Sequence, residues 1–160
     1  MTRPMPPIAI VLGAAGLLPF VLCSLGALSL SSDGATRSLL ALVAYGATIL
    51  AFLGGVHWGF ALDDATGPSD KVQRARFGLG VVPSLIGWTA LLITFVGLPT
   101  TGLLVLTAGF IATTVVEAQA ARRGLMPARY MWLRWGLSIV VVVCLVSVSV
   151  VRAFGGRVVL

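Results

Sequence analysis

Charged side chains are scarce in this sequence of 160 residues. Only 10% of the residues are Asp, Glu, Lys or Arg, whereas 58% are hydrophobic. A typical soluble domain is about 25% charged and about 45–50% apolar, so a water-soluble fold would have too few polar residues to cover its surface. The composition therefore excludes an ordinary soluble protein and leaves no room for a separate soluble domain.

Histidine and cysteine, common ligands of transition metals, are also rare, with one His and two Cys. His57 has no His or Cys near it in the sequence, and Cys23 and Cys144 do not form a CxxC pair. A haem held by two histidines of one chain is excluded, whereas a haem shared across a dimer, or one with Met126 or Met131 as second ligand, remains open. No nucleophile elbow, phosphate loop or dinucleotide fingerprint occurs. We therefore expect no metal, no cofactor and no catalytic residues, which favours a non-enzymatic protein.

What the sequence does contain is a series of five long apolar stretches. Each approaches the ~20 helical residues that cross the ~30 Å hydrocarbon layer of a bilayer. Arg3 and the small residues Ala27-Leu28-Ser29 are features of a signal peptide, but the first run is longer than a signal core, so we expect it to be retained. The sequence predicts an all-α polytopic membrane protein, a single domain over 1–160. Its five transmembrane helices are expected at 7–30, 38–62, 77–96, 100–116 and 130–151.

Basic residues outnumber acidic ones by 11 to 5, and they lie between and beside the apolar stretches. No basic stripe with interleaved aromatic residues occurs, so we expect membrane lipids and no nucleic acid as partners. Positively charged loops stay in the cytoplasm, which predicts a cytoplasmic N-terminus and a C-terminus outside. The N-terminal side holds Arg3, Lys71, Arg74, Arg76, Arg122, Arg123, Arg129 and Arg134, and the other side holds Arg37, Arg152 and Arg157.

Small residues predict where the helices pack. Closely packed membrane helices use small residues at their contacts, so Gly13 and Gly16 indicate a contact of the first helix, which Pro19 should kink. The short turn Gly97-Leu98-Pro99 predicts that the third and fourth helices are antiparallel neighbours. A small-residue ridge in the second helix predicts a contact with another helix of this chain or with a partner subunit, either a different membrane protein or a second copy of this chain. The ridge consists of Ala47, Ala51, Gly55 and Gly59.

Ionisable residues inside the predicted spans are few, and their burial in a membrane is costly enough to point to function. His57 lies near the inner end of the second helix, Glu117 at the inner end of the fourth, and Arg134 about one turn into the fifth. A cross-helix pair of Glu117 with His57 or with Arg134 is therefore expected. Tyr130 and Trp58 lie in the same layer.

This candidate polar layer has two interpretations. It could form a small pocket, open toward the cytoplasmic side, that binds a lipid headgroup, a quinone or a proton. Alternatively it is an interfacial belt, because Tyr and Trp sit at headgroup level, and a pair of Glu117 with Arg134 would simply hold two helices together.

Four motifs are spread over most of the chain. They are Gly13-x-x-Gly16-Leu17-Leu18-Pro19-Phe20, Tyr45-Gly46-Ala47-x-Ile49-Leu50-x-Phe52-Leu53-Gly54-Gly55-x-His57-Trp58-Gly59, Pro83-Ser84-Leu85-Ile86-x-Trp88 and Leu125-x-Pro127-x-x-Tyr130-x-x-Leu133-Arg134. Together they resemble an uncharacterised bacterial membrane family, a domain of unknown function related to a vertebrate mitochondrial transmembrane protein. The resemblance implies a five-helix protein of the inner (cytoplasmic) membrane with no established reaction. Glu117 stands where that family usually has aspartate, and Ala128 stands where it usually has tryptophan.

Two functions follow as hypotheses. Small size, short loops and missing catalytic groups favour a non-enzymatic accessory or assembly component of a larger membrane complex. The alternative is a carrier that binds a small solute, a proton, a lipid or a quinone in the candidate polar layer.

Overall fold

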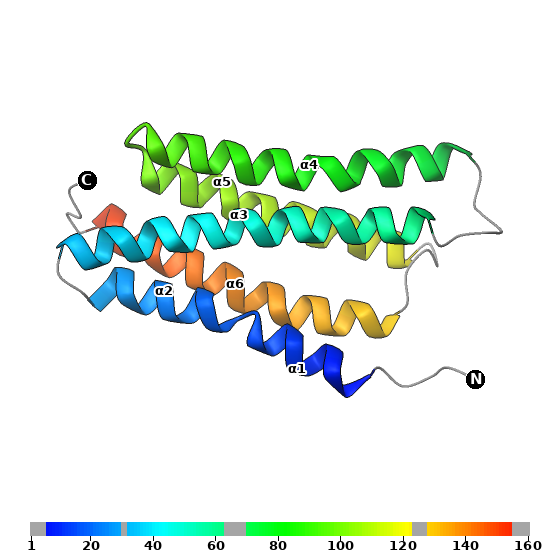
Figure 1. Cartoon of the computed structure of the whole chain (residues 1–160), viewed down its shortest axis with the longest axis horizontal. Helices are drawn as coiled ribbons and strands as arrows, with labels where there is room; N and C mark the ends of the chain where they lie inside the picture. Colours follow the sequence, from blue (N-terminus) through cyan, green and yellow to red (C-terminus); the bar gives the residue numbers. More distant parts are fainter. Residues whose placement is uncertain (1–5, 30–31, 63–69, 123–127, 155–160) are drawn as a thin grey trace.

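The computed structural model describes residues 6–29, 32–62, 70–122 and 128–154. Helices α1 and α2 together make one apolar segment, so five segments of the described chain are long and apolar enough to cross a bilayer. They run along a common axis, and α3 packs against α2, α4 and α5 (Figure 1). The helices are α1 (Pro7–Ala15), α2 (Leu18–Ser29), α3 (Ser32–Leu62), α4 (Asp70–Phe95), α5 (Pro99–Arg122) and α6 (Ala128–Phe154).

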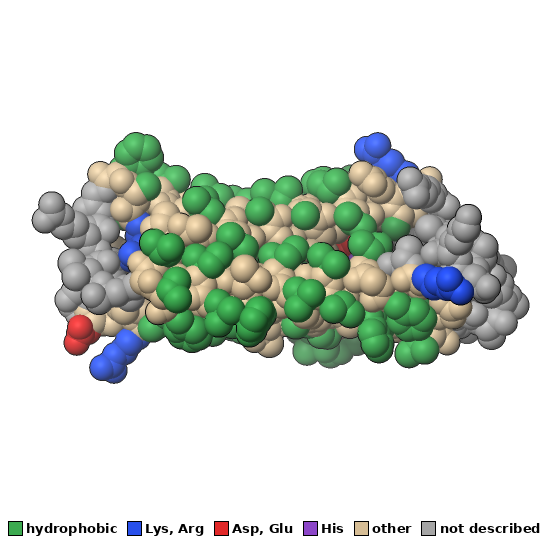
Figure 2. Space-filling view, turned by 90° about the horizontal axis from the view of Figure 1, so that it is seen from above, with side chains coloured by type: hydrophobic (Ala, Val, Ile, Leu, Met, Phe, Trp, Pro, Cys, Tyr) green, Lys and Arg blue, Asp and Glu red, His purple; other side chains and the backbone are tan. Residues whose placement is uncertain are grey.

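Apolar side chains cover the outside of the bundle. Leu12, Phe52 and Trp88 are each more than half exposed. Figure 2 shows hydrophobic side chains over the middle of one face, with Lys and Arg toward its two ends. Such a surface suits lipid tails and would be a large exposed apolar patch in water. The predicted fold class, an all-α membrane protein with five transmembrane helices, is confirmed, while its orientation in the membrane stays a prediction.

The helices alternate in direction. In Figure 1 the first residues of α1, α4 and α6 lie at the same end of the bundle as the last residues of α3 and α5. We call this end the N-terminal end of the bundle. The starts of α1, α4 and α6 and the ends of α3 and α5 therefore share this end of the bundle, which decides where their polar side chains can meet.

Several helices are longer than the apolar stretches that predicted them. The helix α3 begins at Ser32 instead of Ser38, α4 begins at Asp70 instead of Phe77, and α5 ends at Arg122. The prediction followed apolar composition, whereas backbone hydrogen bonds continue a helix through polar residues beyond the hydrocarbon layer. The extra turns carry the charged residues that flank the membrane.

The first membrane span is interrupted near its middle. Gly16 and Leu17 separate α1 from α2, and Pro19 has no N–H to donate to the preceding turn. The hydroxyl of Tyr45 on α3 donates a hydrogen bond of 3.0 Å to the carbonyl of Gly16. A neighbouring helix thus satisfies a backbone group at the interruption, as a membrane interior requires. The predicted kink near Pro19 is present as this break.

The glycines of the first span lie at contacts of the bundle. A Cβ added at Gly13 would be 3.2 Å from Cδ1 of Leu137 on α6. One added at Gly16 would be 3.3 Å from the carbonyl oxygen of Gly13 and 3.8 Å from the hydroxyl of Tyr45. The absence of a side chain at Gly13 lets α1 lie close against α6.

A tight turn joins α4 to α5. The N–H of Gly97 donates to the carbonyl of Thr94, and the N–H of Leu98 donates to that of Ile93, both at 3.1 Å. These two bonds define a Schellman motif, whose left-handed residue is Gly97 with φ of 85°. Pro99 then begins α5 at a position where its missing N–H costs nothing. The two helices are antiparallel neighbours, as predicted.

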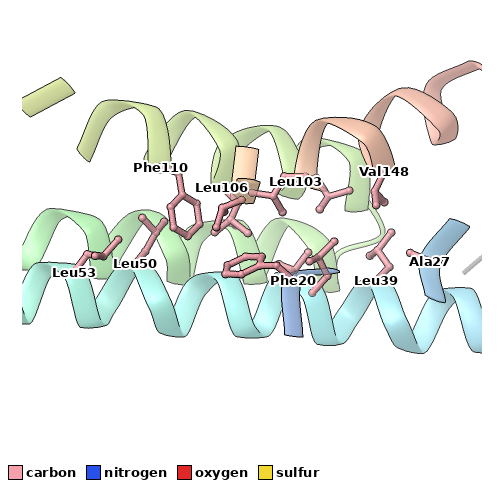
Figure 3. Packing of buried hydrophobic residues seen from close by; sticks show 14 residues of the cluster. Phe20, Ala27, Leu39, Leu50, Leu53, Leu103, Leu106, Phe110 and Val148 are labelled. Carbon is pink, nitrogen blue, oxygen red and sulfur yellow. The ribbon is translucent and has the colours of Figure 1, made fainter. Parts of the chain in front are cut away.

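The core lies along α3. Phe20 of α2, Leu50 of α3 and Phe110 of α5 are at most 1% exposed and belong to one cluster (Figure 3). The rings of Phe20 and Phe110 meet edge to face, with centroids 5.8 Å apart. Lipid tails are as apolar as these side chains, so close packing, more than the hydrophobic effect, holds the helices together.

Glycines bring the backbones of α3 and α4 into contact. A Cβ added at Gly54 of α3 would collide with the carbonyl of Gly80 on α4, and one at Gly80 would collide with the ring of Trp58. Further along, a Cβ at Gly87 would be 2.9 Å from Cα of Ala47. The contact of α3 with α4 therefore depends on these positions having no side chain.

Of the small-residue ridge, only Ala47 takes part in this contact. Ala47 is buried, but Ala51, Gly55 and Gly59 are exposed. A Cβ added at Gly55 or Gly59 would meet no described atom within 4 Å. The prediction of an intramolecular contact is therefore wrong for three of the four residues, because α3 is rotated so that Gly54 faces α4. A contact of the ridge with a partner subunit stays a prediction.

Candidate functional site

Three ionisable side chains from three helices meet inside the bundle. Glu117 of α5 accepts a hydrogen bond of 2.6 Å at Oε2 from Nε of Arg134 on α6. Its Oε1 atom lies 3.5 Å from Nε2 of His57 on α3. The exposed fractions are 0% for Glu117, 3% for His57 and 5% for Arg134. Both cross-helix pairs considered from the sequence occur together, and we call these three residues the buried ionic cluster.

Two hydroxyl side chains extend the buried ionic cluster. Arg134 donates from Nη1 to Oγ of Ser138 at 2.8 Å, and the hydroxyls of Ser138 and Thr114 are 2.9 Å apart. The hydroxyl of Thr114 already donates to the carbonyl of Phe110, so Ser138 is the donor between them. Hydrogen bonds thus continue from the guanidinium through both hydroxyls to the backbone of α5, which fixes the position of Arg134.

The buried ionic cluster leaves two atoms unsatisfied. Among the described residues, Oε1 of Glu117 has no hydrogen-bond donor, since His57 is near but not in hydrogen-bond geometry, and Nη2 of Arg134 has no acceptor. A buried polar group without a partner costs about 1–3 kcal/mol, and more when it is charged. The site therefore lacks one donor and one acceptor.

A cavity of about 380 Å³ adjoins Arg134. Its walls come from α1, α2, α3, α5 and α6 and are mostly apolar, with Tyr130 and Arg134 among the few polar side chains. Leu12 of α1 and Phe52 of α3 also line it, yet they are 64% and 66% exposed. The cavity therefore opens sideways, between α1 and α3, onto the lipid-facing surface. Small-molecule pockets typically have about 300–1,000 Å³ and a few polar groups.

Tyr130 and Trp58, the other residues of the candidate polar layer, are placed differently. Tyr130 is half-buried and lines the cavity together with Arg134. The indole of Trp58 donates a hydrogen bond of 3.1 Å to the carbonyl of Phe77 on α4. Consecutive helix residues point about 100° apart, so Trp58 lies beside His57 in the sequence but outside the buried ionic cluster.

The sequence alone does not single out Ser138 and Thr114 as site residues. Hydroxyl residues are common in membrane helices, so neither attracts notice alone. Ser138 follows Arg134 by four residues and Thr114 precedes Glu117 by three. This spacing places each hydroxyl on the same helix face as a charge, and it is the signal that could have found them.

Replacing Ser138 by alanine is expected to lower the free energy of unfolding by about 1.5–3 kcal/mol, because a buried charged group loses a hydrogen bond. Ser147→Ala is a matched control on the same helix, since that hydroxyl bonds only the carbonyl of Val143 in an exposed position. Its effect should stay within about 0.5 kcal/mol. Unfolding in mixed detergent micelles measures both, and equal losses would contradict the assigned role of Ser138.

Together, the fold and the site define a multi-pass α-helical membrane protein with a buried ionic cluster beside a cavity that opens to lipid. The family described as "Protein of unknown function (DUF3429)" matches residues 5–150. The chain belongs to this family, which confirms the resemblance seen in its motifs.

A relative among known proteins is Transmembrane protein 69 of Xenopus tropicalis, which is 42% identical over 87 residues. The matched region covers 54% of this chain and 33% of the frog protein, so the chain spans about a third of that relative's length. No solved structure matches the chain.

Proposed function

We propose that this protein binds an amphiphilic molecule that enters from the surrounding bilayer. The observation that carries the proposal is the cavity beside Arg134, whose mouth lies between α1 and α3 at lipid-facing residues. Apolar walls would hold a lipid tail, while Arg134 and Tyr130 would hold its polar head. The cavity opens toward lipid and has apolar walls, so its shape does not suit a polar substrate that arrives from water.

The purely structural interpretation accounts for less of the site. A pair of Glu117 with Arg134 would hold α5 to α6. It gives no reason for a cavity that Arg134 lines, or for a guanidinium nitrogen that has no acceptor among the described residues. Intramembrane ionisable residues are functional candidates by default, and these three have a ligand-sized space next to them.

The polar part of the cavity is close to the N-terminal end of the bundle, where α6 begins. Eight of the eleven basic residues belong to that side. The excess of basic residues supports a cytoplasmic position for it. We therefore propose that the head of the ligand sits near the cytoplasmic leaflet of a bacterial inner membrane.

Filling the cavity should prevent binding. Ala9 of α1 lines the cavity, whereas Ala14 of the same helix is exposed and outside it. Ala9→Phe is expected to reduce labelling by a photoreactive long-chain lipid in vesicles about tenfold or more, because the ring takes the space of the tail. Ala14→Phe should label like the wild type. Equal labelling of both variants and the wild type would contradict the proposal.

An accessory role in a larger membrane complex is the second candidate. It is supported by the exposed part of the small-residue ridge, at Ala51, Gly55 and Gly59, where a partner helix could approach the backbone of α3 closely. Cysteine crosslinking from Gly55 in native membranes tests it. A crosslinked second protein in fixed stoichiometry would support the accessory role, and crosslinks to lipid alone would count against it.

A further inference from the structure

The two unsatisfied atoms of the buried ionic cluster are chemically complementary. Oε1 of Glu117 is an acceptor without a donor, and Nη2 of Arg134 is a donor without an acceptor. His57 is the side chain placed to supply the missing donor, because its Nε2 lies 3.5 Å from Oε1 of Glu117. A proton on His57 would supply the donor. An anion in the cavity that Arg134 lines would supply the acceptor once the buried Nη2 turns toward it.

Charge balance links these two additions to each other. With neutral His57, the negative charge of Glu117 and the positive charge of Arg134 cancel, and both side chains are at least nine-tenths buried. An anion added alone would leave a net negative charge in a region of low dielectric, which is costly. A proton on His57 cancels that charge, so the anion and the proton stabilise each other.

Other ionisable groups do not alter this balance. Tyr130 is half-buried, and its phenol is uncharged when protonated. Arg74 and Arg122 are exposed, where solvent screens them, and Arg76 is half-buried and has an interaction partner. The described ionisable side chains of the elements around His57 at this end of the bundle are Arg74 and Arg76 of α4, Glu117 and Arg122 of α5, and Tyr130 and Arg134 of α6.

We infer that the ligand is an amphiphile with an anionic head, a carboxylate or a phosphate, which Arg134 binds from the wall of the cavity while His57 takes up one proton. This inference rests on the proposed function and names the chemical class of its ligand. The guanidinium suits both oxyanions because it presents paired N–H donors. The apolar walls select a long-chain compound over free phosphate or a small carboxylate.

Four probes with the same tail test the inference in nanodiscs of zwitterionic lipid: dodecanoate, dodecyl phosphate, dodecanesulfonate and dodecanol. Full-length protein should bind the anions about tenfold or more tightly than the alcohol, because only they make a charge-assisted hydrogen bond to Arg134. Comparison of the carboxylate with the phosphate shows which head is preferred. In the double variant Glu117→Gln/Arg134→Gln the anions should lose this advantage.

The proton is measured separately. Dodecanesulfonate stays ionised, so any proton taken up on binding goes to the protein. In weakly buffered solution we expect about one proton per bound sulfonate for the wild type and about none for His57→Gln. Sulfonate binding without proton uptake by the wild type, or uptake that persists in His57→Gln, would overturn the inference.

The outcomes separate this inference from the proposed function. Equal affinity for the alcohol and the anions would overturn the anionic head and leave the cavity as a site for a neutral amphiphile such as a quinone. Failure of all four probes to bind would overturn both. The wild-type comparison needs no variant, so a folding defect in the double variant does not affect the result.

Discussion

Replacing Arg134 by leucine is expected to lower the free energy of unfolding by about 3–5 kcal/mol, which is the usual cost of removing one partner from a buried ion pair. Arg134 is 5% exposed and is 2.6 Å from a Glu117 oxygen. Without Arg134, the carboxylate of Glu117, which is 0% exposed, has only His57 as a neighbouring ionisable partner, at 3.5 Å. Steric trapping in bicelles measures this loss directly.

The double variant Glu117→Leu/Arg134→Leu is the control that gives this experiment its meaning. Replacing a buried ion pair with apolar residues is often neutral or stabilising, so most of the lost stability should return. A double variant as unstable as Arg134→Leu would show that the two side chains act independently, which contradicts their assignment to one cluster. If the cavity is a ligand site, this double variant should recover stability but should not recover lipid binding.

Adding a single methyl group at Gly54 is expected to reduce the free energy of unfolding by about 1–3 kcal/mol or more, because an overpacked contact forces its neighbours to move. The atom in its way is the carbonyl oxygen of Gly80, which is backbone and cannot rotate aside. Relief would require α3 and α4 to separate. Moving Gly80 would in turn disturb Trp58, whose ring lies against it.

Gly55→Ala is the matched control one residue away. Its Cβ would meet no described atom within 4 Å, and alanine forms helix better than glycine by about 1 kcal/mol, so stability should stay unchanged or rise slightly. Thermal unfolding of both variants in the same detergent makes the comparison. Loss of stability in Gly55→Ala but not in Gly54→Ala would mean that α3 turns Gly55, and not Gly54, toward α4. Loss of stability in both variants would mean that a partner also covers the small-residue ridge.

The sequence was sufficient for features that depend on composition or on single residues. Apolar length predicted the spans, Pro19 predicted the break, and the alternation of the spans put His57, Glu117 and Arg134 at one level. Rotation of a helix about its own axis was not predictable. In a soluble protein the polar face marks the outside, but here lipid and core are both apolar. The predicted ridge therefore included Gly55 and Gly59, whereas the contact of α3 with α4 is made at Gly54 and Ala47.

The sequence suggested a pocket in the candidate polar layer, but it predicted neither the apolar walls of the cavity nor its opening toward lipid. The walls combine the region of the break, at Gly13 and Gly16, with residues of α3 and α6 that are distant in the sequence. Each has an ordinary packing explanation alone. Only their arrangement around Arg134 makes a space that opens toward lipid. The structure therefore adds more to the description of the candidate site than to that of the fold.

The positions of the three ionisable residues along the chain also have a consequence for biosynthesis. Synthesis proceeds from the N-terminus, so His57 on α3 is made first, Glu117 on α5 second and Arg134 on α6 last. Glu117 and Arg134 are on consecutive helices, so their ion pair forms only when both α5 and α6 have entered the bilayer. Insertion of α6 therefore completes the buried ionic cluster, and a chain that ended before α6 would leave the carboxyl group of Glu117 with His57 alone, at 3.5 Å.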